Sequence, residues 1–238
     1  MACTTFSGAV LGVDGHLVRV EVDLVRRLPA TVIVGLPSGE VRESVERVRS
    51  AILASGFEYP RLRITVNLGP ADLRKEGTGF DLPIAVGILA ASGQIPAEAL
   101  EGVLFSGELS LGGELRPIRG VLPLCTMAAK SHLKAVVLPA SSAEQAAVVP
   151  GVEVRAASNL ASVAAALRRE VLLPVAVPAR WLPPDDDLDL SDVRGQPMAR
   201  RALEIAAAGG HNLLMVGPPG VGVPVARGRG SGGASCRW

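Results

Sequence analysis

The chain has 238 residues, which is enough for one ordinary domain, or for one domain and part of a second. With 48% hydrophobic and 20% charged residues it should fold around a core, and its formal net charge of +1 gives no global reason to expect a nucleic-acid or membrane surface. Aromatic residues make up only 3%, which nearly excludes a stacking platform for single-stranded nucleic acid.

Several strands are predicted in the first 70 residues. Apolar and polar side chains alternate from His16 to Val25, which indicates a strand buried on one face. The Asp14-Gly15 pair before it predicts a hairpin turn to an earlier strand over 5–13. Further strands are predicted over 30–36, where β-branched residues gather, and over 62–68, where apolar and polar residues alternate again.

Two helices are predicted in the first 95 residues. Ser38 stands at an N-cap position before a helix that should end at Gly56, and we interpret the charged side chains of this helix, including Arg47, as a solvated face. Asp81 opens a second, nearly all-apolar helix that should end near Gly93. Because this second helix has no polar face, we expect it to be buried.

The remaining elements of the first domain extend to Glu170. Ser142 and Asn159 are predicted to cap two short helices, the second of which ends near residue 169. Strands and helices are intermixed, with several hairpin-like pairs, so a mixed-sheet α/β or α+β domain fits better than a purely parallel sheet. The other predicted elements are a strand over 103–109, a Gly112-Gly113 turn, a helix over 119–131, and strands over 134–138 and 152–156.

The composition changes after residue 170, and we divide the chain into four parts. Residues 1–170 form the first domain, and residues 171–191, rich in Pro and Asp, are a predicted linker. Residues 192–222 contain a helical pattern, which predicts a helix over 198–208, and then an apolar strand, predicted over 212–216. The Gly/Arg-rich tail, 223–238, is predicted to be disordered.

A glycine- and proline-rich loop follows the strand predicted over 212–216. A phosphate-binding loop needs backbone N–H groups that wrap a phosphate, a Lys for its charge, and a Ser or Thr for magnesium. Val223 and Pro224 stand at the Lys and Ser/Thr positions, so we expect nucleotide to bind poorly or not at all. The candidate cofactor-binding residues, an incomplete phosphate loop, are Gly217, Pro218, Pro219, Gly220, Val221 and Gly222.

Two regions of the sequence resemble one known family. Residues 192–222, DVRGQPMARRALEIAAAGGHNLLMVGPPGVG, resemble the start of the AAA+ module in magnesium-chelatase-like ATPases of the ComM/YifB type. The stretches ITVNLGPADLRKEGTGFDLPIAVGILAASG and FSGELSLGGELRPIRGVLP resemble that family's N-terminal domain, which is similar to the proteolytic domain of Lon. The resemblance implies an α+β domain of the ribosomal-protein-S5 domain 2 type, followed by an incomplete P-loop (AAA+) segment. In the family, GPPGxG continues into Lys-Thr or Lys-Ser, so the departure after Gly222 predicts a truncated or frameshifted reading frame.

For intact members, the resemblance implies ATP-driven DNA processing in natural transformation by a hexameric ring that uses ATP and Mg²⁺. DNA and further copies of the chain are therefore partners implied for the family. Because this sequence ends before a Walker B carboxylate, we expect it to bind no cofactor or metal and to hydrolyse no ATP. Three scattered cysteines and no apolar run long enough to span a bilayer predict a reduced cytoplasmic protein without a membrane partner.

The resemblance to Lon raises the question of a peptidase site. Gly79 stands at the position of Lon's serine nucleophile and Leu122 at that of its lysine, so no catalytic residue is assigned. Thr78 is an alternative nucleophile for which the sequence identifies no base, and Arg74-Lys75-Glu76 is interpreted as a charged surface loop. We therefore expect a non-catalytic Lon-like accessory domain; the alternatives are a divergent peptidase using Thr78 and a stand-alone oligomerisation or interaction module.

Overall fold

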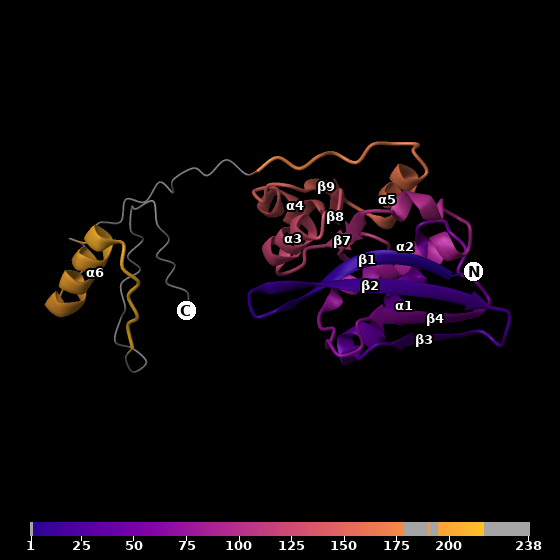
Figure 1. Cartoon of the computed structure of the whole chain (residues 1–238), viewed down its shortest axis with the longest axis horizontal. Helices are drawn as coiled ribbons and strands as arrows, with labels where there is room; N and C mark the ends of the chain where they lie inside the picture. The colour runs from indigo at the N-terminus through magenta and orange to yellow at the C-terminus, as the bar shows by residue number, and fades with distance from the viewer. Residues whose placement is uncertain (1, 179–189, 191–194, 217–238) are drawn as a thin grey trace. The chain divides into compact units, whose positions relative to one another are not determined.

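The computed structural model describes residues 2–178, 190 and 195–216, and the chain divides into two units, Met1–Arg180 and Trp181–Trp238. The first unit contains a seven-stranded sheet with the order β3-β4-β2-β1-β5-β8-β9 (Figure 1). The β1–β2 and β2–β4 pairs are antiparallel and the others are parallel, which confirms a mixed sheet. The strands are β1 (Ala2–Leu11), β2 (Asp14–Val25), β3 (Ala30–Val34), β4 (Arg63–Gly69), β5 (Val103–Phe105), β8 (Ala135–Pro139) and β9 (Glu153–Ala157), with β6 (Glu108–Leu109) and β7 (Leu115–Arg116) forming a separate pair.

Helices cover both faces of this sheet. A Cβ added to Gly87 of α2 would meet the side chain of Val22, whereas one added to Gly15 would meet Pro123 of α3. Val22 and Gly15 lie an odd number of residues apart on β2, so α2 and α3 lie on opposite faces. The helices of the first unit are α1 (Gly39–Ala54), α2 (Asp81–Ala91), α3 (Val121–Lys130), α4 (Ala140–Ala146) and α5 (Leu160–Leu167), with short 3₁₀ turns η1 (Thr78–Phe80) and η2 (Ala97–Leu100).

The β1–β2 hairpin is confirmed, but its turn lies two residues before the predicted one. Leu11 pairs with Asp14, so Gly12 and Val13 form the loop, and Gly12 has the positive φ (63°) that favours glycine. Gly15 instead lies within β2, where an added Cβ would come within 2.3 Å of the Pro123 carbonyl oxygen. Its small size is therefore required for packing against α3.

The predicted helices are present, and one cap is different. Asn159 Oδ1 accepts a hydrogen bond from Ser162 N at 2.7 Å, and Ser38 Oγ accepts one from Val41 N, so both predicted N-caps are confirmed. Every residue of α2 is buried, as its all-apolar sequence predicts. The cap predicted at Ser142 is wrong, because α4 begins after Pro139 and Ser142 Oγ accepts a hydrogen bond from Ile118 N at 3.3 Å.

The strand predicted over 103–109 is divided in two. Ser106 N donates to the carbonyl oxygen of Val137 in the main sheet, but Gly107 N donates to that of Gly79, which precedes α2. Beyond this point Glu108 pairs with Arg116 in the small β6–β7 ribbon. A local pattern of apolar residues cannot indicate this change of partner, because the partners come from distant parts of the chain.

The first unit continues beyond the boundary predicted at residue 170. Ala156 N donates to the Pro174 carbonyl oxygen at 2.9 Å, Ala176 N donates to the Val154 carbonyl oxygen at 2.8 Å, and Leu173 is buried. Proline lacks an N–H donor but keeps a carbonyl acceptor, so a proline-rich segment can still pair with β9 at the sheet's edge. The predicted linker therefore begins later than Val171, and most of it lies outside the described residues.

The described part of the second unit consists of one helix and a short extended segment. The helix predicted over 198–208 is confirmed as α6 (Pro197–Gly209), with Pro197 at its start and Gly210 (φ 62°) at its end. The strand predicted over 212–216 is wrong: these described residues form no regular secondary structure, and none of the described strands pairs with them. Within the described ranges, no helix combines the length and apolar character needed to cross a membrane.

Candidate functional site

The sequence indicates two candidate sites, and the structure describes only one of them. The incomplete phosphate loop, Gly217 to Gly222, and the tail after it lie outside the described residues. The region that resembles Lon's active site is described, and it lies where η1 leads into α2. We call it the Gly77–Asp81 site; it comprises these five residues together with the side chains that contact them, Glu40, Arg47, Ser106 and Glu108.

A buried ion pair holds one end of the site. Arg47 of α1 donates two hydrogen bonds to Asp81, from Nε to Oδ2 at 2.8 Å and from an Nη atom to Oδ1 at 3.0 Å, and Leu109 N donates to Oδ2 at 3.2 Å. The Asp81 side chain is fully buried, and burial raises the pKa of its carboxyl, while the bonds from Arg47 and Leu109 oppose that rise. The hydrogen bond to Asp81 also raises the pKa of Arg47. The prediction that Arg47 lies on a solvated face is therefore wrong.

Thr78, the alternative nucleophile, has a carboxylate partner. Its Oγ1 donates to Glu108 Oε2 at 2.5 Å, and Glu108 Oε1 lies 3.5 Å from Arg116 on β7. The sequence identified no base for Thr78, because Glu108 lies 30 residues away and reaches it only through the β6–β7 ribbon. Glu108 is thus the candidate site residue that sequence reasoning missed.

Around Gly79, where Lon has its serine nucleophile, the backbone groups already have hydrogen-bond partners. Gly77 N, a potential oxyanion donor, donates to Glu40 Oε2 at 3.1 Å. A Cβ added to Gly79 would lie 2.8 Å from Ser106 Oγ, whose hydroxyl donates to the Gly79 carbonyl oxygen at 3.3 Å. At the position that corresponds to Lon's serine, the chain therefore packs Ser106 against the main chain of Gly79.

Lys75 contradicts the prediction of a charged surface loop. Arg74 and Glu76 are exposed and form an ion pair at 3.0 Å, but the side chain of Lys75 between them is fully buried. Its Nζ donates to the Pro70 carbonyl oxygen, and burial lowers its pKa. A buried lysine with a lowered pKa is the kind of base that a serine–lysine dyad uses, but the Thr78 hydroxyl donates to Glu108 instead.

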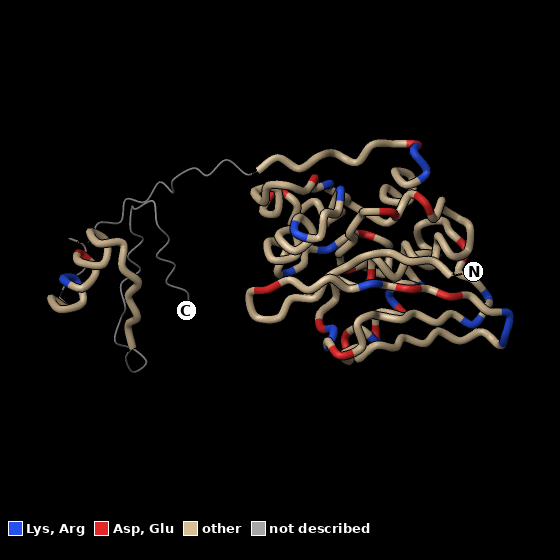
Figure 2. The backbone as a smooth tube through the Cα atoms, in the orientation of Figure 1, with Lys and Arg blue, Asp and Glu red and all other residues tan. Residues whose placement is uncertain are grey.

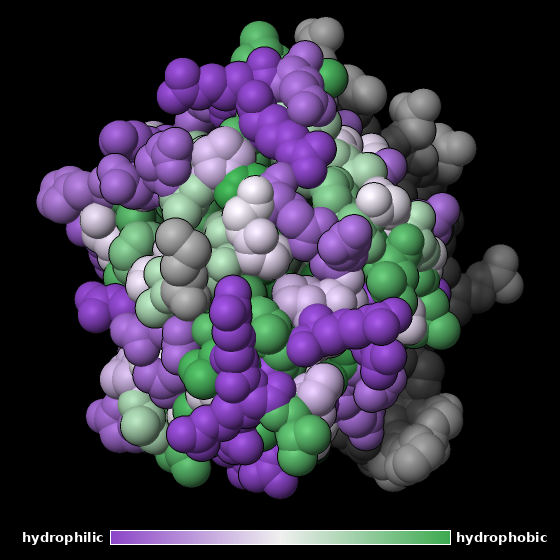
Figure 3. Space-filling view, turned by 90° about the vertical axis from the view of Figure 1, so that its right-hand side faces the viewer, coloured by the Kyte–Doolittle hydropathy of each residue, from purple (hydrophilic) through white to green (hydrophobic). Residues whose placement is uncertain are grey.

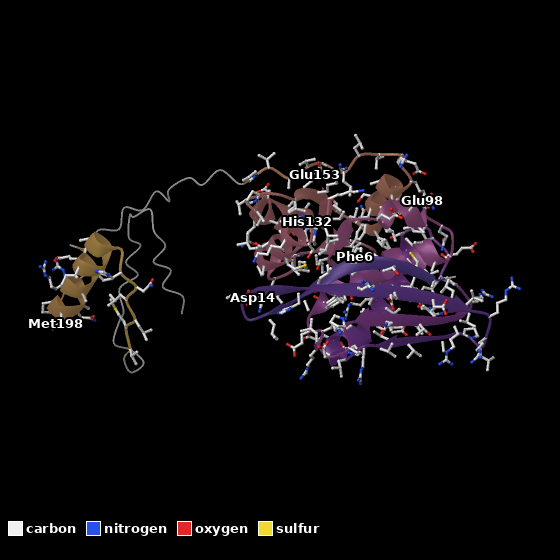
Figure 4. All side chains as sticks on the ribbon, in the orientation of Figure 1. Phe6, Asp14, Glu98, His132, Glu153 and Met198 are labelled. Carbon is white, nitrogen blue, oxygen red and sulfur yellow. The ribbon has the colours of Figure 1, made fainter. Side chains whose placement is uncertain are left out.

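Other reactive groups do not add to this site. Leu122, at the position of Lon's lysine, lines a separate hollow of about 320 Å³ together with the hairpin residues Val13 and Asp14, of which Asp14 is labelled in Figure 4. The thiols of Cys3 and Cys125 are free and buried, and burial raises the pKa of Cys125 to about 11, so it is not a thiolate at neutral pH. Within the ranges described, no three His, Cys, Asp or Glu side chains gather at a spacing suited to a metal ion.

Comparison with known proteins gives matches over most of the chain. The sequence profile of "Subunit ChlI of Mg-chelatase" matches residues 20–142, and that of "Magnesium chelatase, subunit ChlI" matches residues 189–228. Competence protein ComM of Haemophilus influenzae is 45% identical over 222 residues, which cover 91% of this chain and 43% of ComM. The protein YifB of Escherichia coli is 44% identical over 214 residues, which cover 90% of this chain and 42% of YifB.

A weaker match extends to a protease. Lon protease 2 of Bacillus subtilis is 32% identical over 96 residues, which cover 40% of this chain and 17% of the protease. This similarity and the observed fold agree with the Lon-like α+β domain expected from the sequence. The chain spans less than half the length of the ComM and YifB proteins that it matches.

Proposed function

Because the chain belongs to the magnesium-chelatase-like family of ComM and YifB, we propose that its first unit is a non-catalytic, Lon-like accessory domain of that family. One observation carries the proposal: Gly79 occupies the position of Lon's nucleophile, and the Ser106 hydroxyl packs against it. A nucleophile requires a side chain, a base beside it and free donors for the developing oxyanion. Gly79 has no side chain, and the neighbouring N–H of Gly77 is bonded to Glu40.

The ion pair at the start of α2 supports a structural role for the same region. Asp81 is the first residue of a helix that is buried on all sides, and its carboxylate takes hydrogen bonds from two other segments. A carboxylate near a helix N-terminus is stabilised by the helix dipole, and here it also joins α1 to α2 and β6. We infer that the remnant of the catalytic region now fixes how these elements pack.

For the second unit, we propose that residues 192–222 are the beginning of an AAA+ module that does not work as an ATPase in this chain. The residues present do not fit ATP with Mg²⁺, because Val223 supplies no positive charge and Pro224 supplies neither a hydroxyl nor a backbone N–H. The intact family is proposed to use ATP and Mg²⁺ for DNA processing during natural transformation, as a hexameric cytoplasmic ring. The name of the relative ComM, a competence protein, supports that role.

The proposal is tested by assaying the full chain for two activities. We expect no magnesium-dependent hydrolysis of radiolabelled ATP and no cleavage of casein or of the chain itself. Turnover of ATP above that of a heat-inactivated sample would overturn the inactive-ATPase proposal. Casein cleavage by the purified chain would overturn the accessory-domain proposal.

A second candidate function is a divergent peptidase that uses Thr78, and the hydrogen bond from Thr78 to Glu108 is the observation that favours it. The Glu108 carboxylate would accept the hydroxyl proton as Thr78 attacks a peptide carbonyl. Any cleavage should then disappear in Thr78→Ala and persist in Thr126→Ala, which removes an exposed hydroxyl from α3. Cleavage that survives Thr78→Ala would exclude this candidate. A third candidate, an oligomerisation module, is tested by the contact proposed below.

A further inference from the structure

The strand at one margin of the sheet, β3, lacks the charged side chains that commonly discourage pairing with another chain. β3 has β4 as its partner on one side, and among the described residues no strand covers its other side (Figure 1). Residues 28–36, LPATVIVGL, contain no charged side chain, and β3 is uniformly tan in Figure 2. Edge strands are usually protected by charges, bulges or a covering element, so an unprotected edge calls for a partner.

The side chains of this edge are apolar and exposed. Val32 and Val34 point to the same face of the sheet, and their exposed fractions are 37% and 41%. Two exposed leucines flank the strand, Leu28 (88%) before it and Leu36 (55%) after it. On the face of the molecule shown in Figure 3, apolar residues are interspersed with hydrophilic ones.

The two ends of the β3 edge have complementary shapes, a hollow at one end and a protruding leucine at the other. A hollow of about 380 Å³ lies at the end of β3, and Leu36 lines it together with Pro37, Ser38, Gly39, Arg42 and Arg74. The other end carries the protruding Leu28. If two copies pair antiparallel with Val32 opposite Val32, each Leu28 comes beside Leu36 and the hollow of the other copy.

We propose that β3 pairs antiparallel with β3 of a second copy of this chain, centred on Val32. This register places Ala30 opposite Val34, so each cross-strand pair on that face is apolar. A two-fold contact uses the edge of both copies and therefore closes instead of growing into a fibre.

We assign a second copy of this chain, and not another peptide, as the partner of β3. The reason is that the same edge carries both the protruding leucine and the hollow. The exposed leucine at one end meets the hollow at the other end when the edge pairs with itself in reverse. A five-residue strand pair is a small interface, so the dimer should be weak, with a dissociation constant on the order of micromolar or higher. This contact is independent of any ring formed through an AAA+ module.

Cross-linking of the full chain tests the register. Paired residues of antiparallel strands have Cα atoms about 4.5–5.5 Å apart, within the range that a disulfide spans. In a Cys236→Ser background, Val32→Cys should give a dimer band under mild oxidation that disappears on reduction. Leu53→Cys, at an apolar position on α1 that is more exposed than Val32, is the control and should stay monomeric. A dimer band for Leu53→Cys equal to that of Val32→Cys would overturn the proposal.

Sedimentation of variants without cysteine changes provides the second test. Val32→Lys places two like charges opposite each other on the two-fold axis and should weaken the dimer about tenfold or more, whereas Leu53→Lys should not. Far-UV circular dichroism checks that both variants are folded. A wild-type chain that stays monomeric at its highest soluble concentration, or a dimer that Val32→Lys leaves unchanged, would overturn the proposal.

Discussion

Helices α2 and α6 have similar lengths but opposite surroundings. All residues of α2 (Asp81–Ala91) are buried, and its one charged side chain is paired with Arg47. No residue of α6 (Pro197–Gly209) is buried, and its ion pair, Arg201–Glu204, is exposed. Met198, labelled in Figure 4, is 84% exposed.

The contrast shows that the first unit has a hydrophobic core, to which α2 contributes, whereas the described part of the second unit has none. The free energy that stabilises α2 comes from its packing against β1, β2 and α1, so its lack of a polar face is an advantage. α6 has an amphipathic sequence, with Ala199, Ala202 and Leu203 partly covered, but the described residues bury none of it fully. Substitutions in the two helices should therefore have very different effects.

The largest difference is expected for the two ion pairs. Arg47→Ala leaves the buried Asp81 carboxylate without its main partner and should lower the free energy of unfolding by about 3 kcal/mol or more. Arg201→Ala removes an exposed pair and should change it by about 0.5 kcal/mol or less. Urea unfolding followed by far-UV circular dichroism measures both. Equal losses in the two variants would contradict the assignment of Asp81 to the core.

The next largest difference concerns matched isoleucines. Ile84 on α2 is 1% exposed and Ile205 on α6 is 52% exposed. Ile84→Ala creates a cavity and should cost about 2–5 kcal/mol. Ile205→Ala should stay within about 0.5 kcal/mol, as surface substitutions usually do. If Ile205→Ala is as costly as Ile84→Ala in the same urea experiment, α6 packs more tightly than its exposure indicates.

The smallest effect is expected at the helix caps. Asn159 caps α5 through its side chain, whereas Gln196 before α6 makes no side-chain cap bond. Asn159→Ala leaves Ser162 N without its partner and should cost about 1 kcal/mol, measured as a lower unfolding midpoint. Asn159→Ser, which keeps an acceptor, should recover most of the loss. No difference between the two variants would show that the cap bond is unimportant.

Much of the fold could be predicted because its signals are local. The alternation in β2 and β4, the Asn159 cap and the burial of α2 each depend on residues close together in sequence. The break at Ser106 and the pairing of residues 173–176 with β9 could not be predicted, because their partners lie far away in the chain. The same reason explains why the hairpin turn was misplaced: contact with Pro123 determines where Gly15 lies.

For the candidate site, the sequence indicates positions and not contacts. The sequence alone places Gly79 and Leu122 where Lon has its catalytic pair, and Val223 and Pro224 where a phosphate loop has its Lys and Ser or Thr. One clue to the rest was available: Asp81 begins an otherwise apolar helix, and a buried carboxylate requires a partner. The sequence could not predict which side chain pairs with Asp81, because α1 contains several arginines.

The sequence by itself determined the family and the order of most elements, because these depend on which residues occur and at what spacing. The tertiary structure decided that Lys75 is buried, that Glu108 accepts the Thr78 hydroxyl, and that β3 is left at the margin of the sheet. Burial and strand neighbours arise when distant segments meet, and the desolvation and pairing that follow are properties of the folded chain.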